Sequence, residues 1–574
     1  MKNRLIKYIF VAFAITTLMA SCGSALKNLK QEPLNHNVSN MPEKQAKLDK
    51  DQLKNWPHMG MISDTVPGIS TKKAYDEIIK DHKGETVIVG VLDSGVDVYH
   101  EDLADVIWKN EKEIPGNGID DDENGYVDDV YGWNFLGDAV YDNLEFTRIL
   151  KKLKPKYEGK SKEDISADDL KQYELYLRAK KEHAKKTKEA KGIVSQIEFS
   201  QGQFEQNKSA IFSSIEMIEK EIDLEEITLS DIENLETDDR EIKQAQTRVG
   251  MIMAQAEAET TADLIAEFNE AEEQMKRGKA YYEDQLKYYL NLDYDGREIV
   301  GDDVDDITDT DYGNSDVTGP TEDKEDILHG THVAGIIAAT RNNDIGMDGV
   351  ASNVKLMSLR AVPDGDEYDK DIALGIRYAV DNGAKIINMS FGKYFSTHPE
   401  WVIDAMKYAA DHDVLLVKAA GNDSKDLDKN RVYPNDQWPG QEEEITDNVI
   451  VVGALNPTYG EKMVAPFSNY GKTSVDVFAP GARIWATGPM DSYKFLDGTS
   501  MAAPQVAGVA ALIRSYFPKL TAAQVKKVIM DSGITSDQEV ILGEKQDIRK
   551  PFSEISKSGR MVNLYNALIM ASKM

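Results

Sequence analysis

The sequence predicts an α/β protein with a central parallel sheet and a long helical subdomain inserted into it. Short apolar runs typical of buried strands alternate with amphipathic helical patterns along most of the chain, which favours a parallel sheet covered by helices. Between residues 141 and 290 the alternation stops, and Glu, Lys, Gln and Ala dominate. The chain has 574 residues, too many for one small core, so we expect more than one unit.

The strands of the sheet are predicted from five apolar runs that end in turn or polar residues. These runs are 85–95, 354–362, 384–390, 414–422 and 449–455. Helical periodicity fills several of the intervals between them, most clearly at 371–383 and 400–413. Strands that alternate with helices in this way are expected to pair in parallel.

The segment 141–290 is predicted to form a helical hairpin, coiled coil or small bundle, because its apolar residues fall on one stripe per helix. The stripes are Ile211, Ile215, Ile218 and Ile222 in the first arm, and Leu264, Phe268, Ala271 and Met275 in the second. A polar stretch at 226–239 is expected to separate the arms. Each arm has about 55 residues and would reach roughly 80 Å as a straight helix. Such a hairpin either binds a protein partner or is a solvent-exposed helical insertion that binds none.

The charge of the chain limits its partners. The formal net charge is −33, which argues against nucleic acid and anionic lipid, since both need clustered Lys and Arg. It suits the binding of hard cations such as calcium. The only cysteine is Cys22, so no intrachain disulfide can form.

The N-terminus explains that cysteine. Residues 1–21 begin with positive charges and continue with an apolar stretch too short to span a bilayer comfortably. The ending "LMASC" resembles a bacterial lipoprotein signal, which implies cleavage before Cys22 and lipid attached to it. Residues 22–60 would then be a polar tether, with the body in water at the bacterial envelope; Gly23 after the cysteine favours the outer membrane. The alternative is an ordinary secretory signal with an incidental cysteine.

Three short motifs carry the residues of nucleophilic catalysis. "VLDSGVDVYHEDL" places Asp93 at a strand end, "HGTHVAGIIAA" places His329 at a helix start, and "GTSMAAPQVAG" places Ser500 at another. A serine nucleophile needs a base to take its proton and a carboxylate to orient that base. Taken singly, a serine at a helix start is more often only a cap.

The order Asp, His, Ser and all three motifs resemble the subtilisin-like serine proteases, the subtilases of peptidase family S8. The resemblance covers 60–140 and 291–574, which we assign as the two parts of the catalytic domain, 61–140 and 291–574. It implies a three-layer subtilisin-like fold and a serine endopeptidase acting on polypeptides. In the family the first histidine of His-Gly-Thr-His is catalytic, so His332 and His100 are expected to be structural. The inserted segment accounts for the long interval between Asp93 and His329.

The resemblance also implies residues that handle the substrate. Asn422 in "VKAAGND" matches the asparagine that donates to the oxyanion; the alternative is an asparagine that caps a loop. Ser390, Phe391 and Gly392 match the edge strand that pairs with an extended substrate. Val432 stands where glycine often opens the main specificity pocket, which favours a smaller pocket.

An acidic loop is a candidate calcium site. Asp120, Asp122 and Asn124 alternate before a glycine, as in loops that wrap Ca²⁺, and Asp128 and Asp129 are placed to close the shell. The alternative is a solvated acidic loop.

A second calcium site is implied by the resemblance alone. The segment "RNNDIGMDGVA" looks like the subtilase tight calcium loop, with side chains from Asp102 and Asn343. The acidic run 301–312 is less regular and is expected to be a solvated loop.

Two functions remain open. One is an active, lipid-anchored, calcium-stabilised serine endopeptidase. The other is a binding or assembly protein that uses the helical hairpin, with hydrolysis incidental or lost. The complete set of Asp93, His329, Ser500 and Asn422 favours the first, because a binding protein needs none of them.

Overall fold

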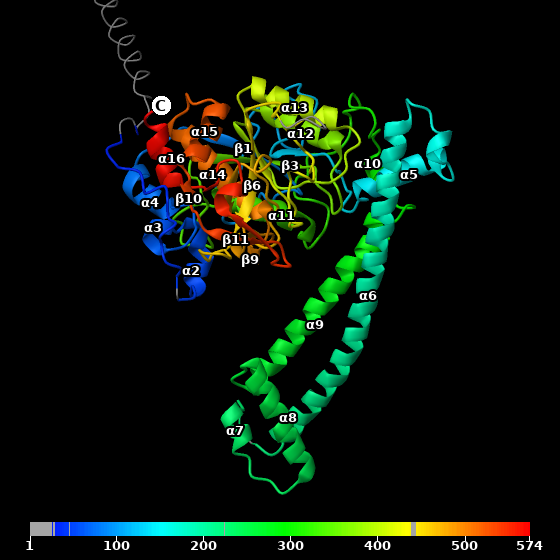
Figure 1. Cartoon of the computed structure of the whole chain (residues 1–574), viewed down its shortest axis with the longest axis vertical. Helices are drawn as coiled ribbons and strands as arrows, with labels where there is room; N and C mark the ends of the chain where they lie inside the picture. The colour runs from blue at the N-terminus through cyan, green and yellow to red at the C-terminus, as the bar shows by residue number, and fades with distance from the viewer. Residues whose placement is uncertain (1–25, 27–28, 45, 223, 225, 438–442) are drawn as a thin grey trace, which may run out of the picture. The chain divides into compact units, whose positions relative to one another are not determined.

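The computed structural model describes residues 26, 29–44, 46–222, 224, 226–437 and 443–574. Cys22 and the predicted signal peptide lie outside these residues, so their assignment stays a prediction. The chain divides into two compact units (Figure 1). We call residues 295–574 with the described residues up to 145 the sheet unit, and residues 146–294 the inserted unit; the sequence placed the insertion at 141–290.

A nine-stranded sheet forms the centre of the sheet unit in the described part of the chain, with the order β10-β13-β7-β6-β5-β4-β1-β3-β2. Neighbouring strands are parallel, apart from the antiparallel pair β10 and β13 at one edge. The strands are β1 Val87–Asp93, β2 Gly132–Asn134, β3 Val354–Arg360, β4 Ile386–Met389, β5 Leu415–Ala419, β6 Val449–Leu455, β7 Val477–Pro480, β10 Ile534–Thr535 and β13 Arg560–Met561. The α/β fold and all five predicted strands are confirmed.

Helices cover both faces of this sheet, as the alternation of β1 shows. A Cβ at Gly90 would contact Ala379 of α12, whereas Asp93, on the other face, contacts Gly330 of α11. The helices of the sheet unit are α2 Lys50–Asn55, α3 Met61–Asp64, α4 Thr71–Ala74, α10 Arg297–Val300, α11 Leu328–Ala338, α12 Asp369–Asp381, α13 Pro399–Asp411, α14 Thr499–Tyr516, α15 Ala522–Ser532 and α16 Leu564–Ala571. Two hairpins complete it: β8 Ile484–Gly488 with β9 Ser492–Leu496, and β11 Glu539–Leu542 with β12 Ile548–Pro551.

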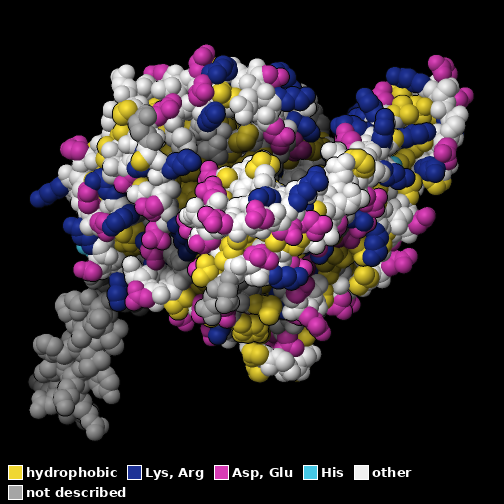
Figure 2. Space-filling view, turned by 90° about the horizontal axis from the view of Figure 1, so that it is seen from below, with side chains coloured by type: hydrophobic (Ala, Val, Ile, Leu, Met, Phe, Trp, Pro, Cys, Tyr) yellow, Lys and Arg dark blue, Asp and Glu magenta, His cyan; other side chains and the backbone are white. Residues whose placement is uncertain are grey.

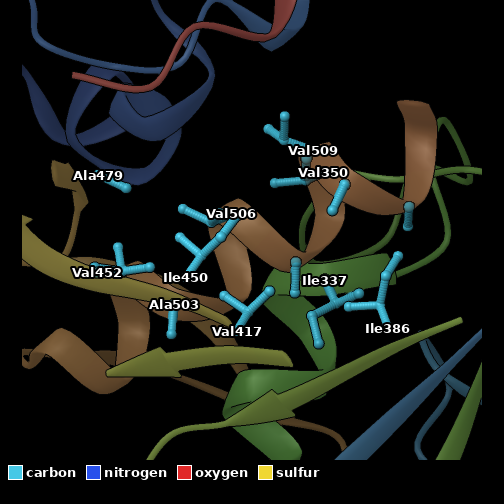
Figure 3. Close-up of a cluster of buried hydrophobic side chains, with 14 of the residues drawn as sticks. Ile337, Val350, Ile386, Val417, Ile450, Val452, Ala479, Ala503, Val506 and Val509 are labelled. Carbon is cyan, nitrogen blue, oxygen red and sulfur yellow. The ribbon is translucent and has the colours of Figure 1, made fainter. Parts of the chain in front are cut away.

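The helix α14 lies in the hydrophobic core, and every one of its residues except Ser500 is buried. Val506 and Val509 pack among valines and isoleucines of the sheet and of neighbouring segments (Figure 3). Its many Ala and Gly residues let the backbone approach the sheet closely; a Cβ at Gly508 would lie 2.6 Å from Val350 Cβ. The core therefore fixes α14, and with it the position of Ser500.

The segment predicted as a polar tether is in fact packed on the sheet unit over its described part. Val38 is buried and its amide donates to the Thr535 carbonyl at 3.0 Å. Trp56 is fully buried and its Nε1 donates to the Ala482 carbonyl at 3.1 Å. The prediction missed these contacts because single apolar residues in a polar segment give no periodic signal.

The inserted unit is helical, as predicted, but its second arm is not one helix. Its helices are α5 Glu145–Tyr157, which begins at the last residue of the sheet unit, α6 Leu170–Glu219, α7 Leu229–Glu233, α8 Arg240–Ala256 and α9 Thr261–Asp284. The second arm breaks at Glu257, whose φ of 55° is left-handed and ends α8. The predicted stripe of the first arm packs at the far end of α6: Ile211, Ile215 and Ile218 are buried with residues of α8 and α9.

The acidic run 301–312 is not a wholly solvated loop. The Asp302 carboxylate is buried and lies 2.7 Å from Arg297 and 2.7 Å from Lys370. Arg297 also contacts Asp371 at 2.7 Å, and the Tyr312 hydroxyl donates to Asp371 at 2.6 Å. Two cations and two carboxylates compensate one another in this buried network, which sequence spacing did not indicate.

The surface reflects the acidic composition. On the face shown in Figure 2, acidic and basic side chains are interspersed among apolar ones. Within the described residues, no helix combines the length and apolar character that a membrane span requires.

Candidate active site

The structure brings Asp93 and His329 into direct contact. Asp93 is the last residue of β1, and His329 is the second residue of α11. The Nδ1 atom of His329 lies 2.6 Å from Asp93 Oδ1, which also accepts the Ser94 amide at 2.8 Å. A Cβ at Gly330 would lie 2.1 Å from the Gly95 carbonyl oxygen, so only glycine allows this approach of helix and strand end.

The electrostatics of the pair suit a base near neutral pH. Asp93 is 1% exposed, whereas the His329 side chain is 40% exposed. Burial alone would lower the pKa of His329, but the charge of Asp93 and its hydrogen bond outweigh burial and raise that pKa above 6.5. A neutral imidazole held through Nδ1 presents Nε2 as the proton acceptor.

Ser500 lies at the start of α14, next to the end of β4. Its Oγ donates to the Ser390 carbonyl at 3.0 Å, and Ser390 Oγ donates back to the Ser500 carbonyl at 2.8 Å. The hydroxyl of Ser500 therefore points to Ser390 rather than to His329. In ligand-free sites the bond between nucleophile and base is often long and tightens only with substrate.

Asn422 is oriented by a residue that the sequence did not single out. Its Oδ1 accepts both the amide and the hydroxyl of Thr499, each at 2.9 Å. The amide Nδ2 is thereby left as the donor, and it lies 3.4 Å from the Cβ position of Gly498, beside Ser500. Thr499 was overlooked because it reads as a helix cap. It acts as a positioning residue for Asn422.

A cavity of about 300 Å³ adjoins these groups. Ser390, Phe391 and Gly392 form one of its walls, and their pairing with an extended substrate stays a prediction. Val432 also lines it, and its Cγ1 would lie 2.9 Å from a Cβ at Gly392. The wall of Val432 narrows the cavity, in keeping with the predicted smaller pocket.

A further wall of the cavity, residues 365–367, was not predicted. It is held from behind by residues 140–143: the Asp142 amide donates to the Asp364 carbonyl at 2.9 Å, and the Asp364 amide donates to the Val140 carbonyl at 2.8 Å. Gly365 has a φ of 146°, and a Cβ there would lie 2.4 Å from the Asp142 carbonyl oxygen. This wall has no motif, and only the fold shows that it faces Ser390.

The other two histidines of the motifs are structural. His332 is fully buried, with Nε2 at 3.1 Å from the Lys494 carbonyl, and burial lowers its pKa to about 4. His100 is buried, and its Nδ1 accepts the Asp102 amide at 3.0 Å. Neither side chain is placed to serve Ser500.

The acidic loop forms a candidate cation site that contains two predicted ligands, Asp120 and Asp122, together with Glu113, which was not predicted. Carboxylate oxygens of Glu113, Asp120 and Asp122 all lie within 4.8 Å of one another. Asp122 Oδ1 is buried and has no hydrogen-bond partner within the described part of the chain. A buried carboxylate oxygen without a donor fits a hard cation. Glu113 was missed because it lies outside the alternating pattern.

Three predicted ligands of this loop have other roles. Asp128 accepts the amides of Gly116 and Gly118 at 2.7 and 2.9 Å. Asp129 is fully buried and accepts the side chain of Asn124 at 2.9 Å and the hydroxyl of Tyr378. These bonds shape the loop, and Asp128 and Asp129 are not among the three clustered carboxylates.

The second predicted calcium pair is in contact. Asn343 Nδ2 donates to Asp102 Oδ1 at 2.7 Å, and the Met347 amide donates to Asp102 Oδ2 at 3.2 Å. Asp102 is fully buried, and burial raises its pKa. The side chains meet as the resemblance implied.

Comparison with known proteins identifies the family. The Subtilase family model matches residues 84–547, which is more than half of the chain. The chain therefore belongs to the subtilase family.

Individual relatives match shorter stretches. The "Thermophilic serine proteinase" of Bacillus sp. (strain AK1) is 39% identical over 40% of this chain and 49% of its own length. "Subtilisin DY" of Bacillus licheniformis is 38% identical over 37% of this chain and 73% of its own. A solved protease of Pseudoalteromonas arctica PAMC 21717 is 30% identical, with 42% of this chain and 70% of that chain covered and a TM-score of 0.34.

Proposed function

We propose that this chain is a serine endopeptidase that uses Asp93, His329 and Ser500 to hydrolyse peptide bonds in polypeptides. The observation that carries the proposal is the 2.6 Å contact between Asp93 and His329, at the same edge of the sheet as Ser500 and its cavity. Family membership supports the same activity.

Each residue has a defined task in this reaction. His329 Nε2 takes the proton of the Ser500 hydroxyl as Oγ attacks the carbonyl carbon, and later gives it to the leaving amine. Asp93 holds the proton on Nδ1 and stabilises the imidazolium that forms. Asn422 Nδ2 donates to the oxygen on which negative charge develops, because Thr499 has fixed the amide in that orientation.

The substrate would lie extended between the two walls of the cavity. Residues 365–367 and 390–392 both line the cavity, and an extended peptide bound there can add a strand to either segment. The side chain next to the attacked carbonyl would then enter the cavity beside Ser500.

The decisive experiment uses Ser500→Ala. The variant should lose turnover on the order of 10⁶-fold and keep its melting temperature, because it lacks only one hydroxyl. A fluorophosphonate probe should label the parent protein and not the variant. The binding or assembly alternative predicts that the probe labels neither protein. That result would replace the proposal with the alternative.

We also propose that calcium binds the cluster of Glu113, Asp120 and Asp122. Bound there, the ion would offset two of the three negative charges and fix the loop. A cation that binds only the folded state adds about 2.7 kcal/mol to the free energy of unfolding when its concentration is 100 times its Kd.

Excess chelator should therefore lower the melting temperature of the parent. Asp122→Asn should remove this response, whereas Asp105→Asn, at an exposed carboxylate outside the cluster, should keep it. A response unchanged in Asp122→Asn would assign the calcium elsewhere, for example to Asp102 and Asn343.

The N-terminal proposal is lipid attachment at Cys22, with the protein held at the bacterial outer membrane. It rests on the sequence of the first 22 residues. Cys22→Ser should move the protein from the membrane fraction to the soluble fraction. Identical fractionation of the parent and the variant would favour a secretory signal with an incidental cysteine.

A further inference from the structure

The cavity beside Ser500 is acidic. Its lining includes Asp366, Glu367 and Asp423, and no lysine, arginine or histidine is among its lining residues. A cavity lined by charges of one sign concentrates ligands of the opposite sign. Its volume of about 300 Å³ lies at the lower end of the range for ligand pockets, which suits one long side chain.

Glu367 is the buried carboxylate among the acidic residues that line the cavity. It is 3% exposed, whereas Asp423 is exposed and accepts the Tyr394 hydroxyl at 2.6 Å. Asp366 is half-buried, and its Oδ2 accepts the Glu145 amide at 2.7 Å. Glu367 lines the same cavity as Ser500 and Asn422.

The cations near Glu367 are shared among several acids. Lys393 lies 3.2 Å from Glu145 and 3.0 Å from Asp369, and its Nζ donates to the Glu367 carbonyl oxygen at 2.7 Å. Lys418 is buried below the cavity, where burial lowers its pKa to about 8. The Lys418 Nζ lies 3.8 Å from the Cβ position of Gly392 on the cavity wall, so the three acids of the lining outnumber the two lysines beside it.

We propose that this cavity selects a basic side chain, lysine or arginine, in the substrate residue whose carbonyl Ser500 attacks, and that Glu367 is the specificity-determining residue. The proposal rests on the proposed peptidase function and adds its substrate class. A cationic side chain that enters the narrow cavity along Val432 brings its charge to a buried carboxylate, where water screens the attraction little. An uncharged side chain of the same length gains no such interaction.

The preference should depend on pH. Burial, partly offset by Lys393, raises the pKa of Glu367 to about 7. Asp366 and Asp369 favour the same rise, and Lys418 also faces this group. Glu367 carries its charge above that pH, so discrimination in favour of lysine should grow as pH rises through about 7. The ionisation of His329 cancels when two substrates are compared on one enzyme.

The test compares matched peptides that carry lysine or norleucine at this substrate residue. Norleucine keeps the apolar length of lysine without its ammonium group. For the parent, kcat/KM should favour lysine about tenfold or more, mainly through KM. In Glu367→Gln this ratio should fall about tenfold. Asp404→Asn removes an equal charge from an exposed position on α13 and should keep the parent ratio.

The outcomes separate this proposal from the peptidase function. Cleavage that prefers norleucine or phenylalanine, or a ratio within twofold of the parent in Glu367→Gln, would overturn the specificity and leave the peptidase function intact. Loss of cleavage in Ser500→Ala would confirm that function independently. Should Glu367→Gln fail to fold, the pH dependence of the parent ratio decides: a flat ratio between pH 6 and pH 8 would overturn the role of Glu367.

Discussion

The helices α14 and α6 show how differently the two units are stabilised. All 18 residues of α14 except Ser500 are buried, and the helix forms although Pro504 and Gly508 lie within it. The 50-residue α6 has buried residues near its ends and none between Ala190 and Ile211. Tertiary packing therefore holds α14, whereas the middle of α6 depends on local helix propensity and side-chain pairs along its surface.

The difference between α14 and α6 matters for function, because it decides how firmly residues of each helix are positioned. A residue in α14 or in the strands next to it is positioned by many long-range contacts, and these contacts place Ser500. A residue in the middle of α6 is positioned by its own helix and by a few contacts, such as Phe204 with Phe268 at 5.5 Å between ring centres. Substitutions in the two units should therefore differ in both size and sign.

Among the substitutions that compare the two units, Asp93→Asn should have the largest effect, because it changes the chemistry of the sheet unit without changing its shape. Removing the carboxylate should lower kcat about 10⁴-fold. The parent should lose activity as pH falls through the raised pKa of His329, because a protonated imidazole cannot accept a proton. The variant lacks the charge that raises this pKa, so any residual activity should persist to lower pH. A profile that does not move would show that Asp93 does not control His329.

The next effect is expected from Gly508→Ala in α14. The added methyl group would lie 2.6 Å from Val350 Cβ, so the packed core must shift. Overpacking of this kind costs about 1–3 kcal/mol, which exceeds the gain in helix propensity. Urea unfolding followed by tryptophan fluorescence should show the loss. An unchanged midpoint would mean that the core around α14 is looser than its burial indicates.

The same substitution in α6 should have the opposite sign. A Cβ at Gly202 would meet nothing within 4 Å, so Gly202→Ala adds only helix propensity, about 0.5–1 kcal/mol. Amide hydrogen exchange should slow in peptides that cover residues 191–210 and stay unchanged in α14. Faster exchange there would show that Gly202 has a packing role and would break the comparison.

The smallest effect on peptide cleavage is expected from removal of the whole inserted unit. The segments that flank it are adjacent: a Cβ at Gly296 would lie 2.5 Å from the Tyr141 carbonyl oxygen. A Gly/Ser linker in place of 146–294 should therefore leave cleavage of small peptides within about threefold. Residues 140–145 must stay, since they support the wall at 365–367.

Cleavage of folded proteins should rise if the inserted unit restricts access and fall if it recruits substrates. An insoluble product would make the unit an integral support.

The sequence was most informative where one local pattern decides the structure. The apolar runs predicted β1 and β3 to β6 because burial on both faces requires continuous apolar residues. The motifs pointed to Asp93, His329 and Ser500 because each position needs small neighbouring residues or a sharp turn of the backbone, and these leave a recognisable local pattern. The first arm of the insertion was predicted because its stripe has helical periodicity.

The rest depends on contacts between distant segments. Glu113 and Glu367 look like ordinary surface carboxylates in the sequence, and only the fold buries them at 6% and 3% exposure. Asp302 reads as part of a solvated acidic run, but its partners Arg297 and Lys370 give it a buried environment. Trp56 stands alone in its polar segment because its partner Ala482 follows several hundred residues later in the sequence.

The position of the inserted unit between β1 and β3 also bears on how the protein is made. The two strands pair in parallel with Val87 opposite Val354, so the ribosome must add 267 residues before this pair of neighbouring strands can form. At about 5–20 residues per second this takes roughly 15 to 50 s. The helices of the inserted unit need only nearby partners and can form during that interval. Their early folding would shorten the loop that β1 and β3 must close. Until β3 has been synthesised, the apolar strand β1 stays unpaired and is the segment most exposed to misfolding.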